Sequence, residues 1–394
     1  MIDDYSPHPI QPVRVGFVVH AMQVAGAEVL VRETIHRLGD RITPTVFCLD
    51  KVGPIGDALT AEGVDVVCFH RRPGWDFAVA RRLATAATAR RIEVLHAHQY
   101  TPFFYAAVAK PFVRPTPRLI LTEHGRHYPD LVSPKRRAVN RVVLDRLADA
   151  VNACCQFSAT ALCRVDGFRG GRIAVIENGI DLPRYAPAAD KAALKQALGL
   201  DPDRRVLAHV ARHHPVKDQA TLIRGFARAA PDLPDVELVM VGDGPLRDDL
   251  TTLARTQGVG GRVRFVGVQS NVADWLRAAD VFALTSVSEA ASLTLLEAMA
   301  AGLPVVVSAV GGNPEIVRAC VEGLHFPRGD DVALADRITT LFRDPALAAR
   351  MGAAGRARVE ARYQLSRTID AYARLYGRLA GRGSGLPAGA PSGV

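Results

Sequence analysis

Short apolar runs alternate with segments of helical periodicity along the chain. VRVGFVV (13–19) and TPTVFCL (43–49) flank AEVLVRETIHRL (27–38), in which apolar residues recur every three or four positions. Further apolar runs, each followed by a loop or an amphipathic segment, lie at 64–69, 92–97, 118–122 and 172–177. Continuous apolar strands between amphipathic helices are typical of a parallel sheet that is covered on both faces. The pattern therefore predicts an α/β fold.

The same alternation begins again in the second half, with candidate strands at 205–211, 236–242, 262–267, 280–286, 303–309 and 322–327. Two successive doubly wound units fit this restart better than one large sheet. Gly and Pro interrupt the pattern within 178–194, where we place the boundary. We expect domains at 1–182 and 183–364, a helix at 365–380 that packs back on the first domain, and a disordered Gly/Pro/Ser-rich tail at 381–394.

Composition agrees with a soluble folded protein. The 394 residues include 23% charged and 48% apolar side chains, and no apolar run reaches the roughly 18–20 residues that span a bilayer. The N-terminus lacks an apolar signal core, so we expect a cytoplasmic protein. The six cysteines form no CxxC pair and are predicted to be reduced core residues: Cys48, Cys68, Cys154, Cys155, Cys163 and Cys320.

The net charge of +9 arises from Arg-rich segments such as 81–91 and 133–146. We interpret them first as solvated helix faces. The alternative is a basic face that attracts an anionic lipid surface or an anionic substrate. Nucleic-acid binding is not expected, because no aromatic-and-basic module or recognition helix accompanies the charge.

Two glutamates, Glu289 and Glu297, are the first candidates for chemistry, in SEAASLTLLEAMAAGLPVVVSAVGG (288–312). On one helix they would lie about 12 Å apart along the axis, whereas paired glycosidase carboxyl groups lie about 5–10 Å apart. The sequence instead predicts Glu289 in a loop after a strand and Glu297 in the second turn of a helix that begins near Ser292. The amides at this helix N-terminus suit a phosphate. The arrangement favours two carboxylates that hold a ligand.

This segment, together with 298–317, resembles the signature of the retaining glycosyltransferases of family 4. The family's GT-B fold has two facing Rossmann-like, doubly wound parallel-sheet domains with an interdomain cleft. The resemblance implies that Glu289 contacts the donor sugar and Glu297 the ribose. The diphosphate would be bound by the backbone of Ala291, Ser292, Leu293 and Thr294. Many relatives have Gly-Phe-Gly where this chain has Ala290-Ala291-Ser292.

HVARHHPVKDQATLIRGFA (209–227) resembles the family's Arg-x4-Lys element. Two fixed cations, Arg212 and Lys217, would stabilise the growing charge of a departing nucleoside diphosphate without a metal. The resemblance also implies that Gly242, in VGDGPLRDD, forms part of the donor-site wall. It implies base contacts at Gly267, Val268 and Asn271.

In the first unit, 21–31 resembles the family's Gly-Gly-x-Glu loop, with Ala25 in place of the first Gly and Gly26 as the donor contact. The family's catalytic Thr-x-His histidine corresponds to His124. His98, at the preceding strand end, is a candidate sugar contact or supporting residue. Arg126 and His127 could reach an acceptor. The resemblance extends to Gly311, Gly312 and Glu315 at the last strand end, and to Asn178-Gly179-Ile180-Asp181.

We therefore expect a retaining glycosyltransferase that uses a UDP- or GDP-sugar, no cofactor and no metal ion. Its acceptor would be a glycan or lipid-linked molecule in polysaccharide or glycolipid synthesis, at the cytoplasmic membrane face. Asp201-x-Asp203 is interpreted as a turn, and 101–113 as a buried helix in preference to a lipid-facing edge. The alternatives are a nucleotide-sugar epimerase of the same architecture and a catalytically silent sugar-binding partner in an assembly complex.

Overall fold

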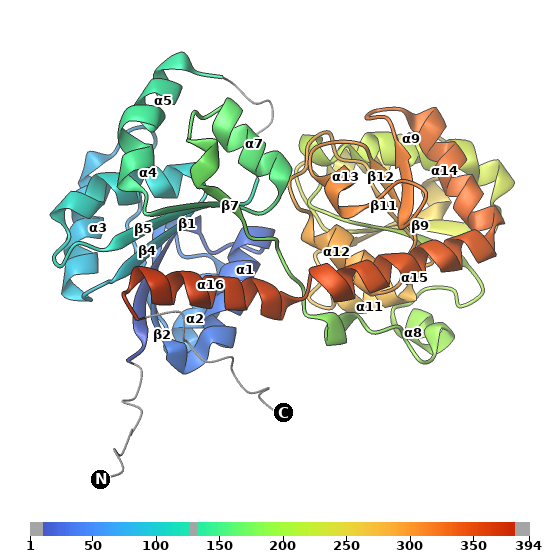
Figure 1. Ribbon diagram of the computed structural model, residues 1–394. Coiled ribbons are helices and arrows are strands. Elements are labelled where there is room, and N and C mark those ends of the chain that lie inside the picture. Colours follow the sequence, from blue (N-terminus) through green and yellow to red (C-terminus); the bar gives the residue numbers. More distant parts are fainter. Residues whose placement is uncertain (1–10, 126–131, 383–394) are drawn as a thin grey trace, which may run out of the picture. The chain divides into compact units, whose positions relative to one another are not determined.

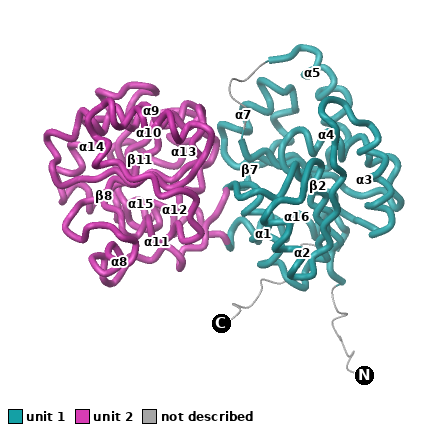
Figure 2. Tube along the Cα trace, turned by 180° about the vertical axis from the view of Figure 1, so that it is seen from behind, with its two compact units in different colours: residues 1–177, 366–394 teal, residues 178–365 magenta. Residues whose placement is uncertain are grey.

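A computed structural model describes residues 11–125 and 132–382 and divides them into two compact units. Unit 1 comprises 1–177 with 366–394, and unit 2 comprises 178–365 (Figure 2). The division falls after Glu177, five residues before the boundary expected from the sequence. The expected tail lies outside the described residues from 383 onward.

Unit 1 is built on a parallel sheet of order β3-β2-β1-β4-β5-β6-β7 (Figure 1). Its strands are β1 (Val13–Ala21), β2 (Ile42–Lys51), β3 (Asp65–Cys68), β4 (Val94–His98), β5 (Arg118–Glu123), β6 (Ala150–Ala153) and β7 (Ile173–Val175). Strand β6, which has four residues with the polar Asn152 among them, was not predicted from the sequence. The remaining expected strands are confirmed to within a few residues.

The helices of unit 1 are α1 (Gly26–Leu38), α2 (Pro54–Ala61), α3 (Phe77–Ala89), α4 (Tyr100–Ala109), α5 (Pro134–Val139), α6 (Asp145–Leu147) and α7 (Gln156–Arg164), with a π-helix (Asn140–Leu144) between α5 and α6. The last helix, α16 (Leu365–Leu379), joins them from the end of the chain. Buried Phe103, Ala106 and Ala107 confirm that α4 is a buried helix rather than an exposed edge.

Unit 2 repeats the architecture with a parallel sheet of order β10-β9-β8-β11-β12-β13. Its strands are β8 (Arg205–Val210), β9 (Val236–Val241), β10 (Val263–Gly267), β11 (Val281–Leu284), β12 (Val305–Ser308) and β13 (Gly323–Phe326). The helices are α8 (Lys191–Ala197), α9 (Gln219–Ala229), α10 (Arg247–Thr256), α11 (Val272–Ala278), α12 (Leu293–Ala300), α13 (Asn313–Ile316), α14 (Asp331–Arg343) and α15 (Pro345–Arg362).

The apolar strands of unit 2 are explained by two cores, one on each face of the sheet. In β12, Val305 and Val307 pack into one cluster and Val306 into the other, because successive strand side chains point to opposite faces. Residues of α11, α12 and α15 complete the first cluster, and residues of α9, α10 and α14 complete the second. This is the two-sided burial that the apolar runs predicted, and the α/β fold class is confirmed.

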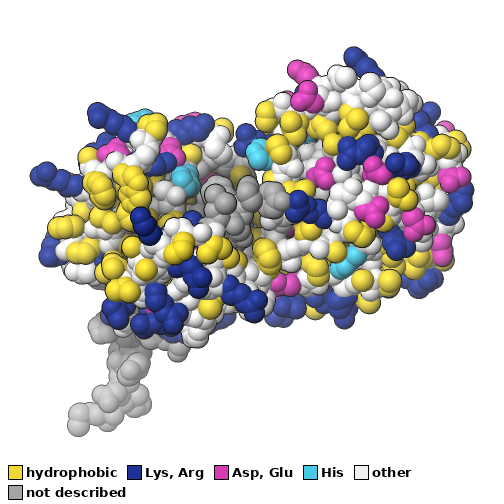
Figure 3. Space-filling view, turned by 90° about the horizontal axis from the view of Figure 1, so that it is seen from above, with side chains coloured by type: hydrophobic (Ala, Val, Ile, Leu, Met, Phe, Trp, Pro, Cys, Tyr) yellow, Lys and Arg dark blue, Asp and Glu magenta, His cyan; other side chains and the backbone are white. Residues whose placement is uncertain are grey.

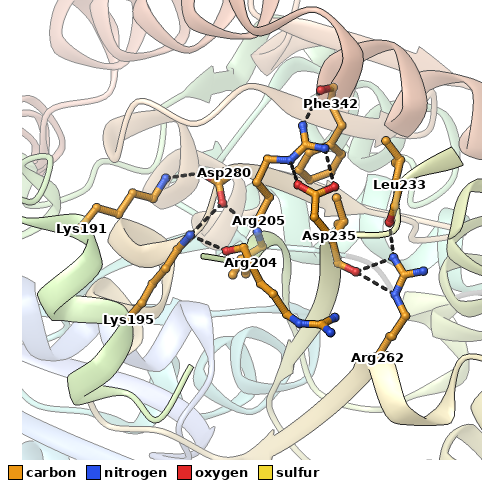
Figure 4. A network of polar contacts seen from close by, with 11 residues as sticks. Lys191, Lys195, Arg204, Arg205, Leu233, Asp235, Arg262, Asp280 and Phe342 are labelled. Atoms are coloured by element: carbon orange, nitrogen blue, oxygen red, sulfur yellow. Dashed lines mark hydrogen bonds and ion pairs between the residues drawn. The ribbon is translucent and has the colours of Figure 1, made fainter. Parts of the chain in front are cut away.

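The amino-terminal edge of this sheet carries a network of ion pairs (Figure 4). Arg205, at the start of β8, binds both carboxylate oxygens of Asp235, and Asp280, just before β11, accepts Lys191 Nζ at 2.7 Å. A shallow cavity of about 330 Å³ lies on the same edge, lined in part by Lys191, Asp280 and Pro304. In α/β sheets ligand sites form at the opposite, carboxyl edge. We therefore assign this network to stability.

The cysteines partly differ from the expectation of core residues. Cys48, Cys154 and Cys155 are buried, and all six cysteines are free thiols. Cys68 and Cys163 are half-buried, and Cys320 is exposed. The prediction was wrong for Cys320, because this residue lies in the short loop between α13 and β13 and not inside an apolar strand or helix.

Candidate functional site

The carboxyl edge of the unit 2 sheet gathers most of the residues singled out in the sequence. Strand order reverses between β8 and β11, which lie side by side. Arg212 and Lys217 follow β8, and Glu289 follows β11, so the two loops that diverge at this reversal carry the candidate cations and the first candidate carboxylate. Such a switch point is where open α/β sheets bind ligands.

Glu289 is held by two donors. Its Oε1 accepts Lys217 Nζ in a short ion pair and Ser286 Oγ at 2.7 Å. The Glu289 side chain is 9% exposed and that of Lys217 is 24% exposed. The carboxylate is therefore fixed in position and charged groups of both signs lie at one end of the sheet. Ser286 was not predicted as a site residue, because a serine at a strand end has no distinguishing sequence pattern.

The loops after β8 and β11 are tied together by backbone and side-chain hydrogen bonds. Val287 donates its amide to Val216 O at 2.9 Å, and Thr285 Oγ1 lies 3.0 Å from the carbonyl oxygens of both Lys217 and Asp218. Gln219 Nε2 donates to Arg212 O at 2.9 Å. Arg212 itself is exposed, and within 11–125 and 132–382 its guanidinium has no hydrogen-bond or ion-pair partner. The backbone of the loop after β8 is therefore fixed by hydrogen bonds, and the Arg212 guanidinium is available to a ligand.

A pair of glycines holds the Glu289 backbone. Gly312 donates its amide to Glu289 O at 3.1 Å, and Gly311 has a left-handed φ of +55°. A Cβ atom at Gly311 would lie 1.8 Å from Glu289 O, so only glycine fits there. Glu315 lies nearby in α13, and its carbonyl accepts Arg358 Nη2 at 2.9 Å. The sequence placed Gly311, Gly312 and Glu315 at a strand end, but only the structure shows that the two glycines contact the backbone of Glu289.

Helix α12 begins as predicted, with Ser292 as its N-cap residue and Ser292 Oγ 3.4 Å from the Leu295 amide. Asn178 Nδ2 donates to Ala291 O at 3.4 Å, which fixes the approach to the helix. The amides of Leu293 and Thr294 belong to the first turn, where backbone N–H groups have no partner within the helix. The segment 291–294 therefore offers donors at the same sheet edge as Glu289.

Glu297 lies in the second turn of α12, as predicted, and hydrogen-bonds the Tyr185 phenol. Burial raises the pKa of Glu297, while the Tyr185 hydrogen bond acts in the opposite direction. Burial also raises the pKa of Tyr185. Tyr185 ends a short 3-10 helix (Leu182–Tyr185) far away in sequence, so no local pattern could have identified it.

The proposed base-contact residues are only partly brought together. Gly242 donates its amide to Gly267 O at 2.8 Å, and a Cβ atom at Gly242 would lie 2.1 Å from Ala211 O. Val268 is 70% exposed next to this contact. The Asn271 side chain is turned to its own helix, where Nδ2 lies 3.4 Å from Asp274 Oδ2.

In unit 1, His98 at the end of β4 meets His124 just after β5. His98 Nδ1 lies 2.7 Å from His124 Nε2, and the two rings are nearly parallel. Burial lowers the pKa of His98 well below its ordinary value, so this ring is neutral. The sequence placed both histidines at strand ends, and the structure brings them into contact.

A third histidine, His96, was not singled out in the sequence. Its Nδ1 lies 2.7 Å from the Tyr376 hydroxyl of α16, and its Nε2 lies 2.7 Å from Thr122 Oγ1. The rings of His96 and His98 are 4.1 Å apart. Helix α16 therefore reaches the strands that carry His98 and His124. A tyrosine 280 positions away cannot be linked to His96 from one sequence.

Gly26 opens α1 in an exposed position, preceded by Ala25 in an extended conformation. Arg126 and His127, the candidate acceptor residues, lie outside the described residues. Asp201-x-Asp203 lies in a turn, where the Asp203 amide donates to Asp201 Oδ1 at 3.0 Å. The described residues include no group of three or more His, Cys, Asp or Glu side chains placed to hold a metal ion.

Two parallel-sheet Rossmann-like units, the second with cations and carboxylates at its switch point, are typical of the GT-B class of glycosyltransferases. Known proteins agree with this class. Residues 24–184 match the model of "Glycosyltransferase Family 4", and residues 190–358 match that of "Glycosyl transferases group 1". The chain belongs to this family of glycosyltransferases.

Among curated relatives, N-acetyl-alpha-D-glucosaminyl L-malate synthase of Bacillus anthracis is 28% identical over 302 residues, which cover 76% of this chain and 78% of the relative. D-inositol 3-phosphate glycosyltransferase of Mycolicibacterium gilvum is 36% identical over 61% of this chain, and the match spans about half of that relative (54%).

Among solved structures, Anabaena HepE in complex with UDP and glucose has a TM-score of 0.82 and 24% identity, with 93% of this chain and 100% of HepE covered. Sucrose-phosphate synthase from Thermosynechococcus elongatus has a TM-score of 0.78 and 22% identity, over 93% and 99% of the two chains. These likenesses confirm the GT-B fold. No helix in the described part of the chain is both long enough and apolar enough to cross a bilayer.

Proposed function

We propose that this protein is a retaining glycosyltransferase that moves a sugar from a nucleotide-diphosphate sugar to a glycan or lipid-linked acceptor without a metal ion. The observation that carries the proposal is the Lys217–Glu289 ion pair at the switch point of unit 2. It joins a candidate phosphate-binding cation to a candidate sugar-binding carboxylate in one fixed arrangement.

Arg212, Lys217 and the α12 N-terminus are proposed to bind the diphosphate. Two cations and a helix N-terminus stabilise the negative charge that grows on the leaving group. Lys217 is held by Glu289, and Arg212 has no partner among the described residues, so the pair combines one fixed cation with one that can close on the ligand. This clamp supports departure of the diphosphate without Mg²⁺.

Glu289 is proposed to bind the donor sugar. Both of its observed partners use Oε1, which leaves Oε2 to accept a hydrogen bond from a sugar hydroxyl. Glu297 is proposed to bind the ribose hydroxyls while Tyr185 keeps its carboxylate oriented. A UDP-sugar is our first choice of donor, because a structural neighbour was solved with UDP and glucose. A GDP-sugar is the second.

We propose retention of the anomeric configuration with the departing diphosphate oxygen as the base that takes the acceptor proton. Glu289 is already paired with Lys217, which makes it a weak nucleophile and supports a route without a glycosyl-enzyme intermediate. His124 is proposed as the catalytic histidine in unit 1, with His98 as the residue that positions it. Polysaccharide or glycolipid synthesis at the cytoplasmic membrane face is the proposed setting.

A thermal-shift panel of UDP, GDP and ADP tests the donor site, with Glu297→Ala as the site variant and Glu360→Ala, on the exposed surface of α15, as its control. A nucleotide at 100 times its Kd should stabilise the protein by about 2.7 kcal/mol. We expect a shift with UDP that Glu297→Ala loses and Glu360→Ala keeps. No shift with any nucleotide in the unaltered protein would overturn the proposed donor class.

Sugar conjugates of the nucleotide that binds are then assayed as donors with a panel of acceptors. NMR determines the anomeric configuration of the product. The panel includes glycans and lipid-linked sugars, and also L-malate and inositol 3-phosphate, because relatives are named for these two. An inverted product would contradict the retaining mechanism. A sugar isomer without transfer would identify an epimerase, and nucleotide binding without any turnover would favour a silent partner.

A further inference from the structure

Helix α5 and the following π-helix expose a row of valines. The buried side of this segment is narrow and includes Asn140 and Leu144. The solvent-facing valines are Val132 (56% exposed), Val139 (48%), Val142 (54%) and Val143 (47%). Several half-exposed β-branched residues on one short segment are unusual for a surface that meets only water, and such clusters mark interaction sites.

The charge around these valines has one sign. Residues 132–147 contain five cations and a single acid, Asp145, which is fully buried and pairs with Arg169 and Arg172. Arg136 turns inward to Asp166 at 2.9 Å. The other four cations have no carboxylate partner in the part of the chain that the structure describes: Lys135, Arg137, Arg141 and Arg146. The exposed face is therefore apolar and basic, with no exposed carboxylate of its own.

The segment is anchored firmly to unit 1. Asn140 accepts the Tyr100 hydroxyl at 2.6 Å and donates to Asp166 O at 2.8 Å, and the Arg136 guanidinium lies 5.5 Å from the Tyr100 ring centre. These contacts use its inner side only. Helix α5 projects at the end of unit 1 in Figure 1, and Figure 3 looks down on that end, where hydrophobic and basic side chains are interspersed.

We propose that this face, residues 132–146, binds the surface of an anionic phospholipid bilayer, with the valines at the acyl boundary and the cations at the headgroups. Apolar residues beside unpaired cations fit a lipid interface, whereas a polyanion such as a nucleic acid would use the cations alone. The segment is too short and too charged to span a bilayer, so it lies on the surface. This inference is independent of the donor site in unit 2.

Co-sedimentation of the full chain with vesicles tests the proposal. We expect binding to vesicles of phosphatidylcholine mixed with phosphatidylglycerol and little binding to phosphatidylcholine alone. Each cation at an anionic surface contributes about fivefold in partition, so Arg137→Gln/Arg141→Gln should weaken binding roughly 25-fold. Val142→Ser/Val143→Ser should weaken it severalfold and should leave less of the binding resistant to high salt.

Matched controls come from exposed positions of unit 2. Arg255→Gln/Arg350→Gln removes the same charge, and Val332→Ser removes a valine that is 60% exposed but stands beside Asp330 and Asp331. Both should bind mixed vesicles as the unaltered protein does. Circular dichroism confirms that each variant is folded.

Three outcomes would overturn the proposal. They are no binding of the unaltered protein to mixed vesicles, equal loss in the unit 2 controls, and valine variants that bind mixed vesicles as well as the unaltered protein does. The last outcome, together with equally tight binding to a soluble polyanion such as heparin, would identify the face as a polyanion surface. In every case UDP binding reports separately on the donor site.

Discussion

His98 and His124 share one short hydrogen bond, between Nδ1 of the first and Nε2 of the second, 2.7 Å apart. When both rings are neutral, one nitrogen must donate and the other accept, so the tautomer of His124 is coupled to that of His98. The pKa of His98 is held low by burial, which keeps His98 uncharged. His98 thus orients a proposed catalytic histidine, and its own ring packs against that of His96, which is hydrogen-bonded to Tyr376.

The first prediction concerns the stability of unit 1 in mild acid. Burial lowers the pKa of His96 to about 3 and that of His98 well below 6.5, whereas both titrate near 6.5 when unfolded. Below pH 6.5 the unfolded chain binds protons that the folded chain does not, so stability falls as pH falls. Two such histidines amount to about 3 kcal/mol between pH 6.5 and pH 5.

Urea unfolding followed by a unit 1 probe at several pH values measures this slope. His98→Leu should roughly halve this slope, and Arg81→Gln, at an exposed position of α3, should leave it unchanged. A free energy of unfolding that stays constant from pH 6.5 to pH 5 would contradict the neutral, buried state of the two rings.

The second prediction concerns Gly311. Gly311→Ala places a Cβ atom where Glu289 O now lies and forces a left-handed φ on alanine. We expect unit 2 to lose more than about 2 kcal/mol of stability and the Glu289 loop to shift. Gly261→Ala is the control, because no atom lies within 4 Å of its Cβ position. Denaturant unfolding and donor turnover measure both effects, and equal behaviour of the two variants would count against the role of Gly311.

The third prediction separates the two members of the ion pair. Lys217→Met should weaken UDP binding by roughly 10- to 150-fold, since a hydrogen bond to a charged group is worth about 1.5–3 kcal/mol. Glu289→Gln should bind UDP within about threefold of the unaltered protein but lose kcat/KM with the UDP-sugar, because its proposed contact is the sugar.

Isothermal titration with UDP and initial rates with the UDP-sugar measure these effects. Lys191→Met, which breaks an ion pair at the opposite edge of the same sheet, should leave UDP affinity unchanged. If Glu289→Gln weakened UDP binding as strongly as Lys217→Met, the carboxylate would be acting mainly by holding the lysine.

The fourth prediction concerns Tyr185 and Glu297. The Tyr185 hydrogen bond lowers a Glu297 pKa that burial raises, so Tyr185→Phe should raise that pKa further. The Glu297 carboxylate of the variant then becomes protonated at a higher pH. As the pH is lowered, UDP affinity should therefore begin to fall at a higher pH in the variant than in the unaltered protein. Titrations with UDP across pH 5 to 8 measure the pH at which the affinity begins to fall. The control Tyr105→Phe, in unit 1, should leave this pH unchanged.

Much of unit 2 could be read from the sequence because its signals are local. Ser292 before an apolar helix and Gly302-Leu303-Pro304 after it fix the ends of α12, and the apolar run after it can only be a buried strand. Glu289 and Glu297 consequently fall in the loop and the second turn that the pattern predicted. The partners of these glutamates could not be predicted, because Ser286 and Tyr185 act through tertiary contacts that leave no spacing pattern in the sequence.

Unit 1 was harder to predict for the same reason. The strand β6 was missed because its four residues include Asn152, and strand length and polarity there are set by neighbouring strands. His96 was passed over in favour of His98, although both lie in β4, because only the fold shows which of the two faces Tyr376 and which faces His124. Positions 96 and 98 are two residues apart, so both side chains point to the same face of the strand, and the alternation along the strand does not distinguish them.

The return of α16 to unit 1 has a consequence for how the protein is made. All seven strands of unit 1 lie before residue 176, but the helix that contributes buried Ile369, Tyr372 and Tyr376 is translated only after the whole of unit 2. Domains usually fold in the order of their synthesis. Here the first unit to leave the ribosome must wait with part of its sheet uncovered, while the second, contiguous unit can fold first.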